Sequence, residues 1–446
     1  MCLLLIEMDY SPHFDLTHLR APISAHLELT DSCTNYCRFC YNPQRHNRIV
    51  QKQDVLSQKD FIEITRKLGE SGLFEIILTG GEPLIRRDSI GPILEEGRNY
   101  NLQFSINSNL VVLNDDDIEI FKRSKLSSIL TSIHHPEPEK HDKIVGVPDA
   151  WNKTMSSIIK LKNNGFEPYV NMVVTRDTTD FVYFLGEKLH KEFGLRKFSA
   201  TPTSPTVEEG TGDMLSINEI KRTLDQLLKL ESDFGIEVDV LETIPYCSIS
   251  EDRYFSFFNR GCSAGRTSIA VSSNGDVRAC THDSRSYGNL LKEELVDIWK
   301  NMSAWRSNEF IPSGCSEKCE EYTSCYGGCR VLAELISEKI NGKDPYMEEP
   351  LRIVLKRSKT QEFDAESSYV LDKNIRYRHE FNDIYCVINS RRGLIFGNGE
   401  LIRMFDFLSK RDSFSVGGLC VELGEKSEEV QGIIKFLNSH YFVKKP

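Results

Sequence analysis

The sequence predicts an α/β fold: an open, partial (β/α)6 TIM-type barrel, then a small cysteine-rich domain and a C-terminal module of strands and helices. Three observations predict it. Six strand-like runs alternate with amphipathic stretches from residue 25 to about 235. Seven cysteines then fall between residues 245 and 330, and a compact apolar pattern resumes at Tyr369.

The barrel prediction rests on six units in a row, which is two fewer than a complete eight-unit barrel needs. The expected strands are Ala25–Leu29, Glu75–Thr79, Leu102–Asn107, Ser127–Ile133, Glu167–Val174 and Lys197–Thr201. The expected helices are Ser57–Ser71, which opens with Ser57 and Asp60 at capping-box spacing, and Asp88–Arg98, Asp115–Ser124, Ala150–Asn164, Asp180–Phe193 and Ile217–Phe234.

The remaining chain divides by composition. Ser273-Asn274-Gly275-Asp276 predicts a hairpin turn within the cysteine-rich segment. In the last part, Tyr385–Asn389 and Gly393–Phe396 read as paired strands, followed by helices at Glu400–Leu408, Ser415–Leu423 and Ser427–His440 and a strand at Tyr441–Lys444. The predicted domains are an N-terminal extension 1–24, the barrel 25–240, the cysteine-rich domain 241–340, a linker 341–368 and the terminal module 369–446.

Composition excludes several classes of protein. The net charge of −11 argues against a nucleic-acid surface. The longest N-terminal apolar run, Leu3–Ile6, is too short for a signal peptide or a membrane span, so we expect a cytoplasmic protein with no membrane partner. Thirteen cysteines in a reducing compartment indicate metal binding more than disulfides.

The first cysteine cluster is Cys33-x3-Cys37-x2-Cys40, directly after the first predicted strand. Parallel barrels place their chemistry at this end of the strands. Three thiolates in eight residues hold three corners of a cubane cluster and leave one iron free for an outside ligand. The alternative is a zinc knuckle with a distant fourth ligand.

This cluster resembles the radical S-adenosylmethionine (SAM) signature, including Phe39 before the last cysteine and the lead-in Leu27–Ser32. Thr79-Gly80-Gly81-Glu82-Pro83 on the next strand end resembles the family segment that holds the methionine amino group. The resemblance implies that SAM and a [4Fe–4S] cluster generate a 5′-deoxyadenosyl radical. It further implies SAM contacts at Phe39, Gly80, Gly81, Glu82, Pro83, Asn107 and Ser132; for Asn107 a capping role is an equal alternative.

One family segment departs from the usual pattern. The His-Asp-x-x-Arg-Gly run reads His141 to Gly146 with Val145 in the arginine place, and Lys143 is a candidate substitute. His134 and His135 end the fourth strand, where a surface or turn role is the common one.

The seven cysteines from Cys247 to Cys329 form a second cysteine field. This field resembles the SPASM domain, which carries auxiliary iron–sulfur clusters. The match lies in Gly275-x4-Cys280 on the hairpin and in Cys325-x3-Cys329; the departures are Cys315-x3-Cys319 and a missing late cysteine after Cys329. By analogy the first auxiliary cluster takes Cys262, Cys280 and Cys329, with Cys247 as a plausible fourth ligand. The second takes Cys315, Cys319 and Cys325, with Cys386, a substrate thiol or nothing as the fourth. A zinc site at Cys315–Cys329 is the alternative, and Cys2 and Cys420 read as ordinary cysteines.

SPASM enzymes act mainly on ribosomally made peptides or on proteins. The terminal module loosely resembles the winged-helix element that binds leader peptides; a dimerisation module is the alternative. These resemblances imply a maturase (RiPP maturase) that forms an intramolecular carbon–carbon or thioether cross-link in a precursor peptide, with a flavodoxin- or ferredoxin-type electron donor. A sulfatase-maturing enzyme is disfavoured because Thr281, not aspartate, follows the hairpin cysteine. An epimerase, a protein-modifying maturase and a non-enzymatic cluster- or zinc-dependent sensor stay open, and no catalytic acid or base is identifiable.

Overall fold

The computed structural model describes residues 19–41, 56–204, 213–258, 260–348, 363–389, 394–423 and 427–446. Contacts divide the chain into two compact units. One spans Ala21–Val354, and the other combines Leu355–Pro446 with Met1–Arg20. No helix among the described residues is long and apolar enough to cross a membrane.

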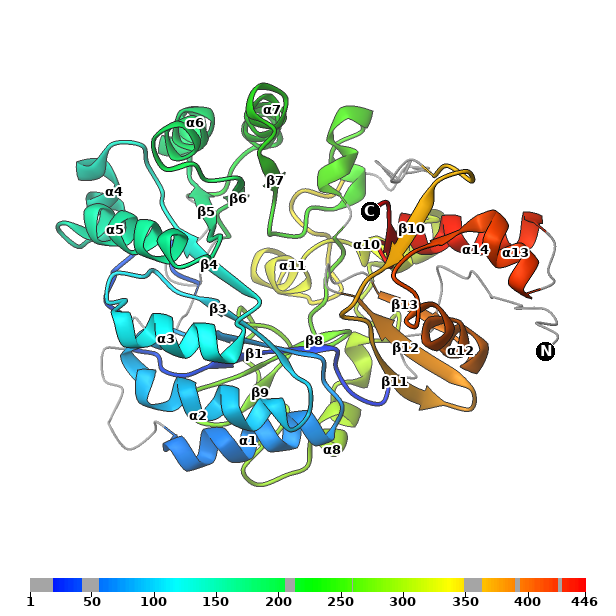
Figure 1. Cartoon of the computed structure of the whole chain (residues 1–446). Helices are drawn as coiled ribbons and strands as arrows, with labels where there is room; N and C mark the ends of the chain where they lie inside the picture. The colour runs from blue at the N-terminus through cyan, green and yellow to red at the C-terminus, as the bar shows by residue number, and fades with distance from the viewer. Residues whose placement is uncertain are drawn as a thin grey trace. The chain divides into compact units, whose positions relative to one another are not determined.

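The first unit is built on a parallel sheet that follows chain order, as a partial barrel requires (Figure 1). The sheet order is β7-β6-β5-β4-β3-β2-β1-β8-β9, and the α/β fold class is confirmed. A seventh short strand, β7, extends the six that the sequence predicts. The bounds are β1 Ser24–Glu28, β2 Glu75–Thr79, β3 Gln103–Asn107, β4 Ser128–Ser132, β5 Tyr169–Val174, β6 Lys197–Pro202 and β7 Glu237–Asp239.

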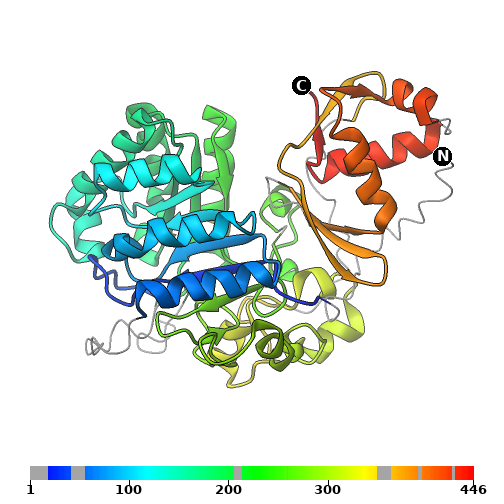
Figure 2. The ribbon, with the colours of Figure 1, turned by 60° about the horizontal axis from the view of Figure 1, so that its bottom comes forward.

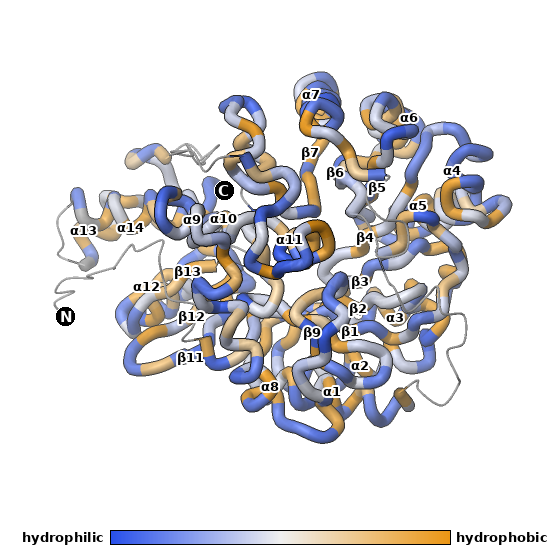
Figure 3. The backbone as a smooth tube through the Cα atoms, turned by 180° about the vertical axis from the view of Figure 1, so that it is seen from behind, coloured by the Kyte–Doolittle hydropathy of each residue, from blue (hydrophilic) through white to orange (hydrophobic). Residues whose placement is uncertain are grey.

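Helices lie along the outside of this sheet (Figure 1). They are α1 Gln58–Glu70, α2 Arg87–Arg98, α3 Asp115–Ser124, α4 Pro138–Val145, α5 Ala150–Asn163, α6 Val182–Phe193 and α7 Ile217–Phe234, with short 3-10 turns η3 Pro83–Arg86 and η4 Arg176–Phe181. The predicted capping box at Ser57 and Asp60 is present at the start of α1. Along the outer helices α6 and α7, hydrophobic and hydrophilic stretches of the tube alternate (Figure 3).

The register gives the sheet two chemically different faces. Residues that alternate with period two and pair across the strands share a face. One face carries Leu27, Leu78 and Ile106, all fully buried. The opposite face is polar and forms its own hydrogen bonds: the Ser105 hydroxyl donates to Glu75 at 3.1 Å, and Ser199 and Thr201 both donate to Asn171 Oδ1 at 2.8 Å. The apolar face packs under the helices, so the polar face lines the inside of the barrel.

The predicted hairpin is confirmed, and it joins the barrel sheet. Strand β8 (Ser268–Val271) pairs parallel with β1, and β9 (Val277–Arg278) pairs antiparallel with β8. Its turn closes through the Gly275 N–H, which donates to the Ser272 carbonyl at 2.9 Å, with Gly275 at φ 89°. The hairpin that carries Cys280 is therefore an extension of the barrel.

The rest of the cysteine-rich segment consists of short helices and turns. They are η5 Tyr246–Ser248, η6 Asp252–Phe257, α8 Leu295–Asn301, η7 Ser303–Trp305, α9 Ser313–Lys318, α10 Tyr322–Cys325 and α11 Arg330–Ser337. Trp299, Trp305 and Tyr326 are almost fully buried here. Apolar burial by these aromatic side chains stabilises the segment alongside any metal it holds.

The second unit is a three-stranded antiparallel sheet, β11-β12-β13, followed by three helices, with a small second sheet β14-β10-β15. Figure 2 shows its longer strands in orange beside its helices in red. The predicted strand pair and all three helices are present; β10, β11 and β14 are additional. Bounds are β10 Ser368–Leu371, β11 Arg376–Phe381, β12 Ile384–Ile388, β13 Leu394–Gly397, α12 Gly399–Leu408, β14 Phe414–Ser415, α13 Val416–Leu423, α14 Ser427–Ser439 and β15 Val443–Lys444.

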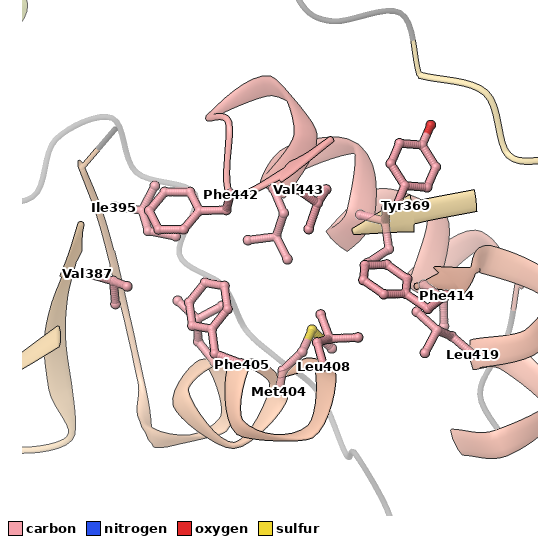
Figure 4. Packing of buried hydrophobic residues seen from close by; sticks show 14 of the residues in the cluster. Tyr369, Val387, Ile395, Met404, Phe405, Leu408, Phe414, Leu419, Phe442 and Val443 are labelled. Carbon is pink, nitrogen blue, oxygen red and sulfur yellow. The ribbon is translucent and has the colours of Figure 1, made fainter. Parts of the chain in front are cut away.

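This unit has its own hydrophobic core. Side chains from α12, from both sheets and from the C-terminal strand converge in it (Figure 4). Phe405 packs against Phe442 with ring centroids 5.5 Å apart, and Tyr369 packs against Phe414 at 6.4 Å. The unit therefore has the composition of an independent packed module.

A buried ion pair fixes the hairpin to the first strand. The Arg278 guanidinium donates to Glu28 of β1, and both side chains are at most 5% exposed. The same guanidinium donates to the carbonyls of Thr281 and Asp283 at 3.2 and 3.0 Å, on either side of His282. Burial raises the pKa of Glu28 to about 7, although Arg278 opposes that shift.

We predict that Arg278→Ala destabilises the first unit by about 3–5 kcal/mol at pH 8, because it leaves the Glu28 carboxylate buried and unpaired. The folded pKa of Glu28 then lies further above its unfolded value of 4.5. The free-energy penalty for ionising the buried Glu28 carboxyl is therefore absent below pH 4.5 and grows as the pH rises. The stability lost in Arg278→Ala is accordingly smaller at pH 5 than at pH 8. Anaerobic urea denaturation at both pH values measures this. The exposed-pair control Arg66→Ala should leave the stability nearly unchanged at either pH. An equal loss at both pH values for Arg278→Ala contradicts the account.

Candidate functional site

The loop that carries Cys33, Cys37 and Cys40 follows β1 and is tied to three other parts of the barrel. The Tyr36 N–H donates to the carbonyl of Val145 at the end of α4, at 2.7 Å. Arg38 donates to Thr175 and Asp177, at the end of β5, at 3.1 and 3.0 Å. These contacts fix the backbone of a loop whose three thiols remain partly exposed.

A third tie joins the loop to the glycine pair after β2. The Gly81 N–H donates to the Thr30 carbonyl at 2.6 Å, and the Glu82 N–H donates to the Ser32 carbonyl at 2.9 Å. A Cβ on Gly81 would lie 2.1 Å from the Ser32 oxygen, and one on Gly80, at φ 119°, would lie 2.4 Å from the Thr30 oxygen. Only glycine allows this close approach, so the pair supports the cysteine loop.

Glu82 is fully buried and connects the segments that follow β2 and β3 through hydrogen bonds. It accepts hydrogen bonds from the Ser108 hydroxyl at 2.7 Å, the Asn109 N–H at 2.8 Å and the Leu84 N–H at 3.0 Å. Burial raises the pKa of Glu82 to about 7, and these hydrogen bonds oppose the shift. Its carboxylate thus joins the ends of β2 and β3. Pro83, also buried, begins the turn η3 that follows.

Asn109 is a site residue that the sequence reasoning missed. Its side-chain amide donates to Cys33 Sγ at 3.5 Å and to Thr34 Oγ1 at 2.9 Å, and its carbonyl accepts from Thr154. An amide hydrogen bond to a sulfur ligand tunes the potential of an iron–sulfur cluster. The sequence feature that could have pointed to Asn109 is its position in the loop after β3, two residues past Asn107.

Phe39 packs into a buried histidine pair. Its ring meets His134 edge-on at 4.8 Å, and His134 stacks on His141 at 5.6 Å. The Val173 N–H donates to His134 Nδ1, and the His134 N–H donates to His141 Nδ1. Burial lowers the pKa of His134 well below its usual value and that of His141 to about 4, so both rings are neutral near pH 7. These histidines support the wall behind Phe39.

The other expected SAM contacts lie at strand ends of the polar face. Asn107 ends β3 and Ser132 ends β4, each half-buried. In the arginine place, the Val145 side chain is buried and its carbonyl holds the cysteine loop, whereas Lys143 is exposed. SAM binding by these side chains stays a prediction.

The cysteine triplet and the hairpin cysteine meet through an aromatic contact. Tyr41, next to Cys40, packs on His282, two residues after Cys280, with ring centroids 4.7 Å apart. Tyr41 also hydrogen-bonds Thr79 at the end of β2, and burial raises its pKa above the usual range. His282 lies 3.9 Å from Glu242. Sequence spacing gave no indication of this contact, because the two loops are far apart in the chain.

Three thiols of the second field form a first group. Burial raises the pKa of Cys329 well above its usual value, and the nearby Glu242, Cys262 and Cys280 add to that shift. Burial likewise raises the pKa of Cys280 to about 12, with Cys262 the next cause. Cys262, Cys280 and Cys329 are therefore electrostatic neighbours, and their ligation of one cluster stays a prediction.

The other thiols form a second group that includes Cys247. Burial raises the pKa of Cys315 to about 11, with Cys325 and Cys319 as further causes. Burial raises the pKa of Cys247 to about 12, with Cys325 and Cys315 among the neighbours that add to it. The structure thus places Cys247 beside Cys315 and Cys325, whereas the sequence analysis assigned it to the first group.

The remaining cysteines belong to the second unit or lie outside the described residues. Cys386 lies buried in β12 of the second unit, and its role as a ligand stays a prediction. Cys420 is partly buried on α13 against the core of that unit, while Cys2 lies outside the described residues. No three His, Cys, Asp or Glu side chains of the described chain are arranged as ligands of a single metal ion.

The residues present fit an iron–sulfur cluster. Thiolates are the soft ligands that such clusters take, and the triplet places three of them on one anchored loop. The glycine pair beside it gives backbone that a ligand is able to approach closely.

Comparison with known proteins identifies two domains. A family model described as the radical SAM superfamily matches residues 27–181, and one described as an iron–sulfur cluster-binding domain, SPASM, matches residues 262–330. These matches contain the triplet, the glycine pair and both cysteine groups except Cys247. SAM and a [4Fe–4S] cluster are thus the cofactors of the first domain, and the second holds auxiliary iron–sulfur clusters.

Relatives with differently named activities match at similar identity. An AdoMet-dependent heme synthase of Methanosarcina barkeri is 24% identical over 72% of this chain and 94% of its own. A PqqA peptide cyclase of Xanthomonas oryzae is 23% identical over 75% of this chain and 89% of its own.

Solved structures share the fold. Streptococcus suis SuiB bound to its precursor peptide SuiA has a TM-score of 0.58 at 18% identity, covering 74% of this chain and 76% of SuiB. The anSMEcpe protein with bound AdoMet has a TM-score of 0.57 at 18% identity, covering 74% and 94% of the two chains.

We predict that Gly81→Ala prevents the cysteine loop from closing on β2, because its Cβ overlaps the Ser32 oxygen. Reconstituted protein should lose about four irons per chain and at least about tenfold in SAM cleavage. Gly91→Ala is the matched control, since a Cβ there meets its nearest neighbour at an ordinary 4.0 Å. Full iron content and cleavage in Gly81→Ala would show that the glycine contact is dispensable.

We predict that Asn109→Ala lowers the potential of the first cluster while its iron content stays whole. One hydrogen bond to a sulfur ligand, at about 1 kcal/mol, corresponds to about 40 mV for one electron. A redox titration followed by electron paramagnetic resonance (EPR) measures it, with Asn152→Ala on the exposed face of α5 as the control. A potential equal to that of the unmodified protein would remove Asn109 from the site.

Proposed function

We propose that this chain, which carries a radical SAM domain followed by an iron–sulfur cluster-binding SPASM domain, is a peptide maturase. It abstracts hydrogen from a ribosomally made precursor peptide and forms an intramolecular carbon–carbon or thioether cross-link.

Sequence identity by itself does not select the substrate, because a heme synthase and a peptide cyclase match equally well. The observation that carries the proposal is the second unit. Its three-stranded antiparallel sheet is followed by three helices around a separate core, which is the winged-helix-like arrangement expected of a leader-binding module.

The leader site that we propose is strand β13. In the order β11-β12-β13 it has one neighbour among the described strands, so it lies at the sheet edge. An extended peptide adds to such an edge through backbone hydrogen bonds, and pockets for alternate side chains provide selectivity. The leader would then hold the modified segment near the barrel by raising its local concentration.

The barrel residues position the reaction. When bound, the cluster and SAM supply hydrogen-atom abstraction from an unactivated carbon. On the polar inner face, Ser199 and Thr201 hold the Asn171 side chain in place by hydrogen bonds to its Oδ1. Tyr41 and His282 separate the triplet from the first auxiliary group, so an electron released when a bond forms has a short route between them. We propose a flavodoxin- or ferredoxin-type protein as the external donor.

The test is anaerobic incubation of the whole, reconstituted chain with SAM, reductant and a candidate precursor peptide from a short reading frame beside its gene. We predict a product lighter by two hydrogens, together with 5′-deoxyadenosine. Both should disappear in Cys37→Ala and persist in Cys420→Ala, which alters a cysteine far from the triplet in sequence.

Other outcomes identify the alternatives. An isobaric product with inverted stereochemistry indicates an epimerase, and turnover of a tetrapyrrole in place of the peptide indicates a heme-type activity. Absence of 5′-deoxyadenosine from fully loaded protein indicates a non-enzymatic sensor. Each of these contradicts the cross-linking proposal.

We predict that the precursor's leader slows amide hydrogen exchange at Leu394–Gly397, because backbone hydrogen bonds to an added strand protect the edge. Mass spectrometry of the full chain with and without leader measures this, and Asp115–Ser124 of α3 should exchange unchanged. Protection confined to the barrel would move the leader site away from β13.

A further inference from the structure

The seven cysteines of the second field are the candidate ligands of two auxiliary clusters. Sequence spacing does not decide which of the two clusters Cys247 ligates. It lies in η5, between the barrel and the hairpin, fifteen residues before Cys262 by number. The contacts of η5 decide which group it joins.

The turn η5 packs on the loop that carries Cys325. The Tyr246 N–H, one residue before Cys247, donates to Cys325 Sγ at 3.4 Å. On the other side, a Cβ built on Gly328 would lie 2.6 Å from Pro245 Cγ, so the Pro245 ring packs directly on the Gly328 backbone. Consecutive Cα atoms are about 3.8 Å apart, and Cys247 therefore begins within a few ångströms of this loop.

The Cys247 thiol contacts the segment Met347–Glu348, which also contacts Cys315. Its Sγ donates to the Glu348 carbonyl at 3.7 Å, while Met347, one residue earlier, places its Sδ 3.8 Å from Cys315 Sγ. The segment is held by the Asp344 carboxylate, which accepts from the N–H groups of Cys329 and Tyr346 at 2.8 and 2.9 Å. Two thiols of different chain segments thus meet at one anchored stretch of backbone.

The SPASM resemblance expects a late cysteine after Cys329, and the sequence has none between Cys329 and Cys386. Cys247 precedes the other cysteines of this field in the chain, and its buried thiol lies against the backbone carbonyl of Glu348.

We propose that Cys247 replaces the missing late cysteine as the fourth ligand of the second auxiliary cluster, with Cys315, Cys319 and Cys325. The first auxiliary cluster then has Cys262, Cys280 and Cys329 and one iron that no cysteine of this field ligates. That iron accepts an exchangeable ligand on the side of Glu242 and His282. This division concerns cluster assembly alone, so it stands or falls independently of the peptide substrate.

The test counts iron and records EPR spectra of the whole chain after anaerobic reconstitution. We compare Cys247→Ala, Cys319→Ala, Cys280→Ala and the two double variants that add Cys247→Ala to each of the others, with Cys420→Ala as the control. Cys247→Ala should weaken the same EPR component as Cys319→Ala. The Cys247/Cys319 double variant should lose about four irons, no more than Cys319→Ala alone, and the Cys247/Cys280 double variant about eight.

The opposite pattern overturns the proposal. It fails if the Cys247/Cys280 double variant loses no more iron than Cys280→Ala alone, or if Cys247→Ala keeps full iron and an unchanged spectrum.

Two further readouts cover variants that fold poorly. Cys247→Ser keeps an oxygen donor, so it should retain iron and shift the EPR component that Cys319→Ala removes; a shift of the component lost in Cys280→Ala contradicts the assignment. With SAM saturating the radical site, added cyanide should perturb the Cys280-dependent component. A perturbation of the Cys319-dependent component would place the exchangeable iron at the other cluster.

Discussion

The buried contact between Glu28 and Arg278 is the constraint on which the arrangement of the first unit depends. Glu28 ends the strand that leads into the cysteine triplet, and Arg278 ends the strand that leads into Cys280. Because the same guanidinium also holds the carbonyls around His282, it sets the two cysteine loops at a fixed separation. The Tyr41–His282 contact is a consequence: the two rings meet because β1 and β9 lie on either side of β8 in one sheet.

Much of this fold follows from local sequence. Short apolar runs and amphipathic stretches placed the six predicted strands and six predicted helices of the barrel within a few residues of their observed bounds, since such patterns are set by neighbours in the chain. Helix α4 was not predicted. Strand β7 was missed because three residues with no apolar run carry no periodic signal. Likewise, Ser273–Asp276 predicted a turn, but not that its hairpin pairs parallel with β1, which depends on distant backbone.

The site shows the same division. The triplet and Gly80–Gly81 were predictable because their spacing is itself the signal. Asn109 was not, because its contact with Cys33 bridges two strand ends. The place of Cys247 was open for the same reason: spacing orders cysteines along the chain, whereas the contacts of Tyr246 with Cys325 and of Cys247 with Glu348 favour the second group.

The central claim is that a precursor peptide is the source of the abstracted hydrogen. The most direct measurement uses a precursor deuterated throughout at carbon, and mass spectrometry of the 5′-deoxyadenosine formed by the reconstituted chain. The account predicts that this product gains one deuterium from the peptide, in a reaction that requires the leader. Production of 5′-deoxyadenosine without deuterium, at the same rate with and without peptide, would contradict it.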